Sequence, residues 1–307
     1  MTSSRRATIA TTGHKQLSEL ASLMADIVLC EPQHLYNLLN QRGLVSRLAE
    51  INYLFLIDAR EAEDYNTGHI ITAKQAKTSK SVFLPFEHVE IDTMQNIVVY
   101  DGKSDSLDSP GRAQQCAKMI SKSSFSTVHI LKGGYEKFTA LFNFFRTEQI
   151  LYTIRELENL RTYPVEILPG KLYMGKETQA NCRTTMEQLM IKAVVRISAD
   201  HMPVWTSDVL RVEVGPEKGK DQFCFEKICD FIDVKMSSGS RVLLVSKHGC
   251  VRCSAAATAY VMLQHRCTFQ EAWSHVRRCK PSVAFDKRYT EQLCEWERRV
   301  SATTTAE

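Results

Sequence analysis

The strongest constraint on the fold is a series of short, apolar, β-rich runs that alternate with helical patterns from residue 28 to about 150. Residues 53–57 and 96–100 are mostly apolar, and an aspartate follows each run, as is common for buried parallel strands. Helical patterns cover 33–40 and 112–122. Strands that alternate with helices form a parallel sheet covered on both faces, so this part of the chain is predicted to be an α/β domain.

A second α/β pattern follows a charged segment that ends in proline at residue 164, which is typical of a linker. Its strand and helix patterns lie at 165–175, 193–197, 223–235, 242–245 and about 253–265. The chain is therefore predicted to hold a tail at 1–27, a domain at 28–150, a linker at 151–163, a domain at 164–300 and a tail at 301–307.

Composition narrows the class of protein. A chain of 307 residues can form two ordinary cores, and 44% hydrophobic with 24% charged residues is typical of globular proteins. The net charge of +4 comes without a long basic tract, so no nucleic acid is expected as a partner. The ten cysteines are scattered without zinc spacing, which predicts reduced thiols in an intracellular protein with no metal and no cofactor. No apolar run approaches the ~20 residues of a membrane span.

The first twenty residues are rich in serine and threonine and carry Arg5, Arg6 and Lys15, with no acid before Glu19. This composition is typical of a mitochondrial transit peptide, and a disordered tail has it as well. Both interpretations stay open. The expected location is the cytoplasm, with the mitochondrial matrix as the alternative.

The run LFLIDAREAEDYNTGHI at 54–70 and the run HILKGGYEKF at 129–138 resemble the signatures of the rhodanese-like fold. In these runs Asp58 is expected to cap a turn, and Gly133 and Gly134 to supply backbone angles that other residues resist. Sulfur transfer needs a thiolate cysteine in the loop after the strand that reads IVVYD here. That loop, 101–113, has no cysteine and three aspartates, so we expect no sulfurtransferase activity.

Rhodanese-like modules without the cysteine also precede the catalytic domain of mitogen-activated-protein (MAP) kinase phosphatases, where a basic cluster docks the kinase. The corresponding stretch, KQAKTSKSVFLPF, offers Lys74, Lys77 and Lys80 but no consecutive arginines. A solvated lysine face is the default interpretation. Kinase docking through these three lysines is the alternative that the resemblance implies.

From VEILPGKLYMG to Trp296 the chain resembles a dual-specificity phosphatase domain. The later runs SAAATAYVMLQHRCTFQEAWSHVRRCKPSV and QLCEWE agree with that family in order and spacing. With a rhodanese-like domain in front, the whole chain is similar to the serine/threonine/tyrosine-interacting-like (STYX-like) pseudophosphatases, relatives of the MAP kinase phosphatases. The resemblance implies two α/β domains, the second with a phosphate-binding loop between a strand and a helix.

The family's loop reads His-Cys-x-x-Gly-x-x-Arg-Ser/Thr. Gly249 and Arg252 are the one pair with the right separation, and this anchor puts Val245 at the histidine and Ser246 at the nucleophilic cysteine. Cys253 falls at the Ser/Thr position. The predicted phosphate-binding loop consists of Ser246, Lys247, His248, Gly249, Cys250, Val251 and Arg252.

Without a cysteine at position 246, the loop is expected to lack the thiolate nucleophile that attacks phosphorus. Backbone amides and a helix N-terminus lower the pKa of a cysteine, whereas a serine hydroxyl without an adjacent base stays protonated. His248 lies two residues along and is expected to point out of the loop. No other cysteine has an arginine six positions later, so Cys250 and Cys253 are expected to be small packing residues.

The general acid of the family is an aspartate on a loop about thirty residues earlier, and this position falls on Gly215 or Val214 here. Glu213 and Glu217 lie close in sequence and are expected to be exposed loop charges. Loss of both groups predicts a catalytically inactive phosphatase. The remaining pocket can bind phosphate through backbone N–H groups and Arg252, or Arg252 ties the loop to neighbouring carboxylates.

Three functions stay open at this point. The first is a regulatory protein that binds phosphorylated partners through the loop, and the second is a scaffold that acts through other surfaces. The third is a weakly active protein tyrosine or serine/threonine phosphatase that uses Ser246. The expected partners are signalling proteins: phosphoproteins, MAP kinases or active phosphatases.

Overall fold

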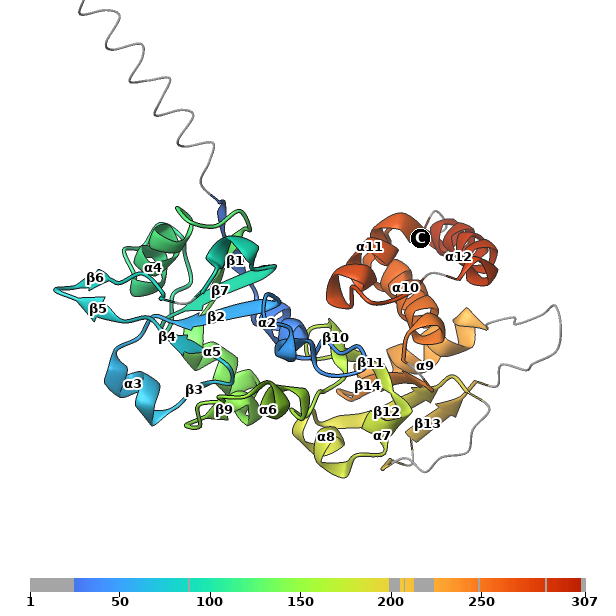
Figure 1. Cartoon of the computed structure of the whole chain (residues 1–307). Helices are drawn as coiled ribbons and strands as arrows, with labels where there is room; N and C mark the ends of the chain where they lie inside the picture. Colours follow the sequence, from blue (N-terminus) through green and yellow to red (C-terminus); the bar gives the residue numbers. More distant parts are fainter. Residues whose placement is uncertain are drawn as a thin grey trace, which may run out of the picture. The chain divides into compact units, whose positions relative to one another are not determined.

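The computed structural model describes residues 25–87, 89–198, 205–206, 208–212, 224–247, 249–284 and 286–304. The chain divides into two compact units (Figure 1). The first holds the described residues up to Leu38 together with Arg47–Leu160, and the second holds Leu39–Ser46 and the described residues from Arg161 onward. Within these described ranges, no helix combines the length and the apolar character that a bilayer crossing requires.

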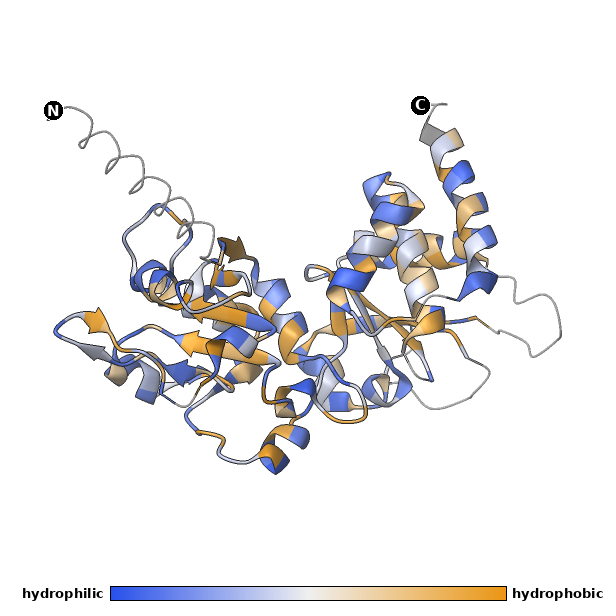
Figure 2. Cartoon of the chain, turned by 45° about the horizontal axis from the view of Figure 1, so that its top comes forward, coloured by the Kyte–Doolittle hydropathy of each residue, from blue (hydrophilic) through white to orange (hydrophobic). Residues whose placement is uncertain are grey.

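The first unit is built on a five-stranded sheet in which all neighbouring strands are parallel. Its strands are β1 Ile27–Cys30, β2 Leu54–Asp58, β4 Lys74–Gln75, β7 Asn96–Tyr100 and β8 Val128–Leu131. They lie in the order β1–β8–β7–β2–β4, and Figure 2 shows their largely hydrophobic colouring. The two runs predicted as buried strands are thus neighbours, with Leu54 paired to Asn96.

The first unit's helices are α2 Pro32–Leu39, α3 Ala62–Thr67, α4 Arg112–Ile120, α5 Gly134–Leu141 and α6 Ile154–Glu158. Short 3-10 turns lie at η1 Arg47–Ala49, η2 Ile91–Thr93 and η3 Asn143–Phe145, and two small antiparallel pairs join β3 His69–Ile70 to β9 Arg146–Thr147 and β5 Thr78–Ser79 to β6 Val82–Phe83.

Helices cover both faces of this sheet, as the sequence predicts. Alternate residues of a strand face opposite sides. Ile97 of β7 packs in one core cluster with Ile120 of α4. On the opposite face, the ring of Tyr100 stacks on Tyr135 of α5 with centroids 6.3 Å apart. The long apolar strands are therefore buried on both sides.

The second unit is also a five-stranded sheet, in the order β10–β11–β14–β12–β13. Its strands are β10 Val165–Leu168, β11 Leu172–Lys176, β12 Ile191–Arg196, β13 Asp208–Arg211 and β14 Arg241–Ser246. Its helices are α7 Glu177–Ala180, α8 Arg183–Gln188, α9 Phe225–Ser237, α10 Val251–His265, α11 Phe269–Cys279 and α12 Thr290–Thr304, with a 3-10 turn η4 at Lys287–Tyr289. The β10–β11 pair is antiparallel and the other three pairs are parallel.

Helix α10 lies in the core of the second unit. Every residue from Cys253 to Met262 is buried, which fits a helix whose sequence is apolar all round. Small side chains such as Ala256 and Ala259 let the helix pack closely against neighbouring elements. The mixed α/β class with largely parallel sheets is confirmed in both units.

The limits of the units differ in detail from the predicted domains. The segment 151–163, predicted as a linker, contains α6, and a capping box between Thr153 and Glu156 fixes the start of that helix. At the carboxyl end, α12 runs to Thr304, into the predicted tail. Residues 1–24 of the predicted tail at 1–27 lie outside the described residues, and β1 begins at Ile27. The domain limits stay a prediction, which limited proteolysis of the whole chain would test.

The segment 39–46 counts with the second unit although it lies within the first predicted domain. In that unit, Gln41 Nε2 donates a 2.9 Å hydrogen bond to the carbonyl of Cys279. Asn40 Oδ1 accepts a 2.7 Å bond from the backbone N–H of Tyr163. These long-range polar contacts have no sequence pattern, because polar residues between two helical patterns indicate a loop and nothing about its partner.

Candidate functional site

The predicted loop lies at the carboxyl edge of the second sheet. Strands β11, β14 and β12 are parallel, so their carboxyl ends meet at one edge. Lys176 at the end of β11 pairs with Ser246 at the end of β14, and Arg196 at the end of β12 pairs with Val245. Ligands of parallel α/β sheets bind beyond these ends. The chain after Ser246 therefore enters α10 at the place where such folds hold a ligand.

Gly249 shapes the turn between the strand and the helix. Its φ of +63° lies in the left-handed region, which disfavours other residues. A Cβ at this position would also lie 2.6 Å from the carbonyl oxygen of Gly175. Its N–H lies 3.1 Å from the carbonyl of Ser246 and 3.2 Å from the Ser246 hydroxyl. Both the conformation and the close approach to β11 thus require glycine here.

The loop ends at the N-terminus of α10. Cys250 is the N-cap, and its carbonyl accepts the first helical hydrogen bond from the N–H of Ser254 at 3.0 Å. The preceding N–H groups, of residues 251 to 253, have no intrahelical acceptor in this geometry. Together with the helix dipole they form a site suited to an anion.

The Ser246 hydroxyl lies at the base of the loop and is almost fully buried. Its oxygen accepts a bond from the N–H of Gly249 and one from the Cys253 thiol, whose sulfur is 3.2 Å away. Both partners are donors. Among the residues that the structure describes, no histidine or carboxylate is hydrogen-bonded to this hydroxyl, so nothing there can take its proton.

The nearest buried carboxylate has other partners. Glu177 accepts a short hydrogen bond from the Ser198 hydroxyl, and its Oε1 lies 3.7 Å from Nε of Arg196. All three side chains are buried. The positive charge of Arg196 keeps this carboxylate paired at the carboxyl edge of the sheet. Glu177 is therefore a structural group beside the loop.

Arg252, the predicted phosphate ligand, lies in the first turn of α10 and is half-buried. In the described part of the chain its guanidinium makes no hydrogen bond and no ion pair. The alternative in which Arg252 ties the loop to neighbouring carboxylates therefore finds no such contact there. The five donors of this side chain stay available to an incoming oxyanion.

Lys280, directly after α11, is a residue of this site that the sequence did not single out. It is only 7% exposed, and its ammonium interacts electrostatically with the thiols of Cys250 and Cys253 and with Lys176. Desolvation by burial is the main cause that lowers the pKa of Lys280. Across the described ranges its ammonium has no hydrogen-bonded or ion-paired partner. A lysine beside a proline normally indicates a solvated turn, so only the fold reveals it.

Three predicted positions cannot be placed. His248 lies outside the described residues, and so do the two candidates for the general-acid position, Val214 and Gly215. The other loop residues between Ser246 and Arg252 lie at the carboxyl edge of the sheet, and their role in phosphate binding stays a prediction.

Comparisons with known proteins agree with this architecture. The family model "Dual specificity phosphatase, catalytic domain" matches residues 172–299, and the model "Rhodanese-like domain" matches residues 32–141. The chain combines a rhodanese-like domain with a dual-specificity-phosphatase-like domain. The whole predicted loop lies inside the first match, and the three candidate docking lysines lie inside the second.

Two curated relatives span both domains. Human dual specificity protein phosphatase 16 is 27% identical over 287 residues, which cover 82% of this chain and 42% of that protein. Human dual specificity protein phosphatase 1 is 23% identical over 290 residues, which cover 80% of this chain and 79% of that protein. The chain thus spans less than half of the first relative and about four fifths of the second.

Similar solved structures cover the second domain. The crystal structure of human DUSP28 is 21% identical, with a TM-score of 0.42, and covers 46% of this chain and 97% of that one. The crystal structure of the human tyrosine phosphatase-like serine/threonine/tyrosine-interacting protein is 23% identical, with a TM-score of 0.37, and covers 44% and 95%.

The rhodanese-like domain has a loop in the corresponding place, after β7, and Asp101 occupies it. Its carboxylate accepts bonds from the N–H groups of Lys103, Ser104 and Ala113 at 3.2, 2.9 and 3.2 Å, and from the Ser104 hydroxyl at 2.6 Å. Cys116 lies buried in α4. The backbone donors that could hold an anionic sulfur are thus filled by the domain's own carboxylate.

The scaffold roles expected in the rhodanese-like domain are borne out. Asp58 caps its turn by accepting a 3.0 Å bond from the N–H of Arg60, and the two side chains form a buried ion pair. Arg60 also donates to the carbonyl of Gly68 at 2.7 Å. Gly133 and Gly134 have φ values of +76° and +55°. These residues hold the turn structure together.

The three candidate docking residues of the rhodanese-like domain are exposed. Lys74 lies on β4, Lys77 follows it, and Lys80 lies in the tight turn between β5 and β6 with a φ of +47°. In the described ranges none of the three forms an ion pair. Lys74 also lines a cavity of about 480 Å³ whose walls are mostly apolar, including Ile51 and Ile154.

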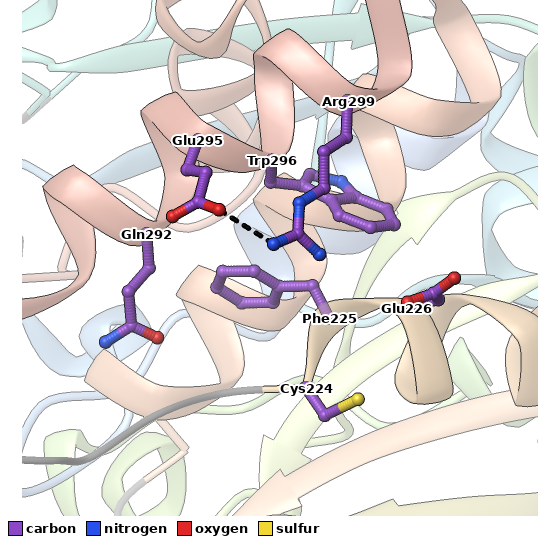
Figure 3. A pocket seen from close by; sticks show the side chains of 7 residues that line it. All are labelled: Cys224, Phe225, Glu226, Gln292, Glu295, Trp296 and Arg299. Atoms are coloured by element: carbon purple, nitrogen blue, oxygen red, sulfur yellow. Dashed lines mark hydrogen bonds and ion pairs between the residues drawn. The ribbon is translucent and has the colours of Figure 1, made fainter. Parts of the chain in front are cut away.

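A further pocket of the phosphatase-like domain involves no loop residue. It has a volume of about 330 Å³ and lies between the start of α9 and α12 (Figure 3). The Phe225 and Trp296 rings form its apolar part with centroids 6.2 Å apart, and Arg299 pairs with Glu295 at 2.7 Å. No sequence pattern predicted this pocket, because its residues come from helices that are distant in the chain.

Proposed function

We propose that the chain is a catalytically inactive, STYX-like pseudophosphatase that binds phosphorylated signalling proteins through the 246–252 loop. It holds the phosphate without cleaving it, and so acts as a regulatory or scaffold protein in phosphorylation signalling of the MAP kinase type. The observation that carries the proposal is the Ser246 hydroxyl, which lies at the base of the loop where an attacking thiolate would be needed.

The absence of turnover follows from the chemistry of this hydroxyl. Attack on phosphorus needs an anionic or base-activated nucleophile. Ser246 Oγ receives two hydrogen bonds, from Gly249 and Cys253, and none of its described partners is a base. Assignment of the general-acid position to Gly215 or Val214 would remove the proton donor for the leaving oxygen as well.

Anion binding is supported by what the site retains. The N–H groups at the start of α10, the guanidinium of Arg252 and the buried ammonium of Lys280 are all suited to phosphate oxygens. A buried lysine without a bonded partner destabilises the fold by its desolvation. Its presence beside the loop is explained if an anion binds there.

The first experiment compares the wild type with Ser246→Cys, alone and with Val245→His, on an aryl phosphate with vanadate as inhibitor. We expect no turnover by the wild type and vanadate-sensitive turnover by the repaired double variant. Wild-type turnover that scales with protein concentration would replace the proposal by a weakly active phosphatase.

Phosphopeptide binding is the second measurement. Arg252→Ala should weaken binding of a phosphotyrosine peptide by roughly a hundredfold, the size of a lost bidentate charge-assisted contact. The exposed Arg277 on α11 provides the matched control, since Arg277→Ala removes the same charge away from the loop. If the two variants bind equally well, the protein acts as a scaffold through other surfaces.

A second candidate function is kinase docking by the rhodanese-like domain. The exposure of Lys74, Lys77 and Lys80 without ion pairs in the described structure favours it. A variant with all three changed to glutamate should lose binding to a MAP kinase and lose the salt dependence of that binding. Lys118, Lys122 and Lys132 changed together provide a charge-matched control.

We also propose an intracellular location, either cytoplasmic or in the mitochondrial matrix. The basic, Ser/Thr-rich composition of residues 1–27 supports the mitochondrial location. A fluorescent protein that carries these residues at its N-terminus should enter mitochondria if they form a transit peptide. Replacement of Arg5 and Arg6 by glutamate should then abolish import. A diffuse signal from both fusions would instead indicate that the protein is located in the cytoplasm.

A further inference from the structure

The phosphate-binding loop contains a Cys-x-x-Cys pair whose place in the fold is unusual for packing residues. Cys250 is the N-cap of α10 and Cys253 is the third residue of that helix. Residues three apart on a helix are neighbours, with Cβ atoms about 5–6 Å apart. A disulfide holds its Cβ atoms about 3.5–4.5 Å apart, so the bond requires a movement at Cys250, whose N-cap backbone is not held in the helical conformation. Neither cysteine is in a disulfide in the structure.

We propose that Cys250 and Cys253 form a reversible disulfide in the presence of hydrogen peroxide, and that this bond switches off anion binding by the loop. The first part stands on the places of the two residues at the start of α10. The second part rests on the proposed function, because it requires that the reduced loop binds phosphate.

The two cysteines differ in the way that such a reaction requires. Cys250 is partly exposed at the N-terminus of α10, so a small oxidant can reach its sulfur. Cys253 is fully buried, and burial raises the pKa of its thiol to about 12, so it stays protonated. Cys250 is therefore the thiol that meets peroxide, and Cys253 is the one that resolves the product.

A buried cation supports the pair independently. The ammonium of Lys280 interacts electrostatically with both sulfurs, the residue as a whole is only 7% exposed, and its side chain has no bonded partner in the described structure. A positive charge at this place stabilises each thiolate as it forms. The same charge favours an incoming phosphate, so oxidation and ligand binding would compete for one electrostatic site.

The chemistry balances in two steps. Peroxide oxidises the Cys250 thiol to a sulfenic acid: an S–O bond forms, the O–O bond breaks, and one water leaves with the thiol proton. The Cys253 sulfur then loses its proton and attacks the Cys250 sulfur. An S–S bond forms as the S–O bond breaks, and a second water leaves. A dithiol reductant reverses the reaction by exchange.

The disulfide would change the loop through Ser246 and Arg252. To reach Cys250, the Cys253 sulfur must leave the Ser246 hydroxyl, now 3.2 Å away. The bond also closes a ring around Arg252, which restricts its side chain and the N–H groups beside it. We therefore expect phosphopeptide affinity to fall by at least about tenfold, the size of one charge-assisted hydrogen bond.

Peptide mapping of the peroxide-treated full chain tests the bond. Trypsin cuts after Lys247, Arg252 and Arg266, so the two cysteines fall on different peptides. A linked pair of 248–252 and 253–266, or the uncut peptide lighter by two hydrogens, is expected, and dithiothreitol should remove it. Cys224→Ser, at an exposed thiol outside the loop, should leave the link intact, and Cys253→Ser should abolish it and leave Cys250 open to further oxidation.

The outcomes separate the two parts. Cys250 oxidised to sulfinic acid in the wild type without the link, or linked to another cysteine, overturns the disulfide. The link with unchanged binding of a phosphotyrosine peptide overturns the switch. If the reduced protein binds no phosphopeptide at all, the proposed function fails and the switch fails with it, while the mass measurement still decides the disulfide.

Discussion

The two domains present a loop at the same place, after a central parallel strand, and use it in opposite ways. In the rhodanese-like domain the loop after β7 is filled by the carboxylate of Asp101, which accepts three backbone N–H bonds. In the phosphatase-like domain the loop after β14 surrounds the small neutral hydroxyl of Ser246. Arg252 and Lys280 near it are positive, and the carboxylate of Glu177 beside it is paired with Arg196.

This difference shows that two loops without a cysteine at the expected position can have opposite electrostatic character. A buried carboxylate accepts the hydrogen bonds of its loop's N–H groups, and its negative charge excludes another anion. A serine leaves the backbone donors and the cations without a negative partner. The first loop is therefore a structural turn, whereas the second is suited to an anionic ligand. The predictions below test that contrast, from the largest expected effect to the smallest.

The largest effect is expected at the glycine of the phosphatase-like loop. Gly249→Ala forces a side chain into the left-handed region and puts its Cβ 2.6 Å from a backbone oxygen. We expect the free energy of unfolding to fall by about 4 kcal/mol and phosphate binding to be lost. Gly170→Ala has a similar φ but nothing within 4 Å, and should cost about 1 kcal/mol. All three tryptophans lie in this domain, so their fluorescence in urea reports its unfolding. Equal losses would show that the approach to Gly175 is unimportant.

Acid should act first on the rhodanese-like domain. Burial is the main cause that lowers the pKa of His34 from 6.5 to about 4, where its ring stacks on His129. The unfolded chain takes up a proton below pH 6.5 that the folded chain refuses until about pH 4. The free energy of unfolding should therefore fall by about 3 kcal/mol as the pH drops through this window.

Hydrogen exchange of the β2 amides at several pH values would measure this loss. His34→Phe keeps a ring beside His129 and removes the titrating group, so it should flatten the profile between pH 6.5 and 4. An unchanged profile in this variant would assign the acid sensitivity to other groups. The tryptophan signal of the phosphatase-like domain serves as the internal reference.

A smaller effect is expected from the carboxylate that fills the first loop. Asp101→Ala leaves three N–H donors without their acceptor and should destabilise the rhodanese-like domain by about 2 kcal/mol. It should also open this loop to sulfate, which would then restore part of the lost stability in a thermal melt. Asp105→Ala, at an exposed aspartate of the same loop, is the control. If sulfate restores stability to neither variant, the loop has no backbone anion site that the Asp101 carboxylate occupies.

The smallest effect concerns the buried cation of the second loop. Its lowered pKa means that the fold disfavours the ammonium, so stability should rise as the pH increases through the folded pKa toward 10.5. At neutral pH, Lys280→Met should stabilise the phosphatase-like domain by about 1 kcal/mol and weaken phosphopeptide binding. Lys287→Met, on η4, controls for charge. A destabilised Lys280→Met protein would make this lysine structural.

Much of the fold was predictable because long apolar runs have few alternatives. The runs at 53–57 and 96–100 are mostly apolar and each is followed by an aspartate, which predicts buried strands, and they form the neighbours β2 and β7. The loop residues 246 to 252 were predictable because a strand, a glycine turn and a helix place them in one short segment. Segment 151–163 was harder, since a helix as short as α6 depends on its capping box more than on periodicity.

The sequence by itself determined two α/β domains and predicted that Ser246 stands at the cysteine position of the loop motif, because strand patterns and motif spacing are local properties of the chain. Only the tertiary structure decided how each loop is satisfied. Asp101 reaches Ala113, twelve residues away, and Lys280 comes from the end of α11 to lie beside Cys250. Burial and charge at a site depend on which distant segments meet there, and hydrophobic pattern alone leaves that undetermined.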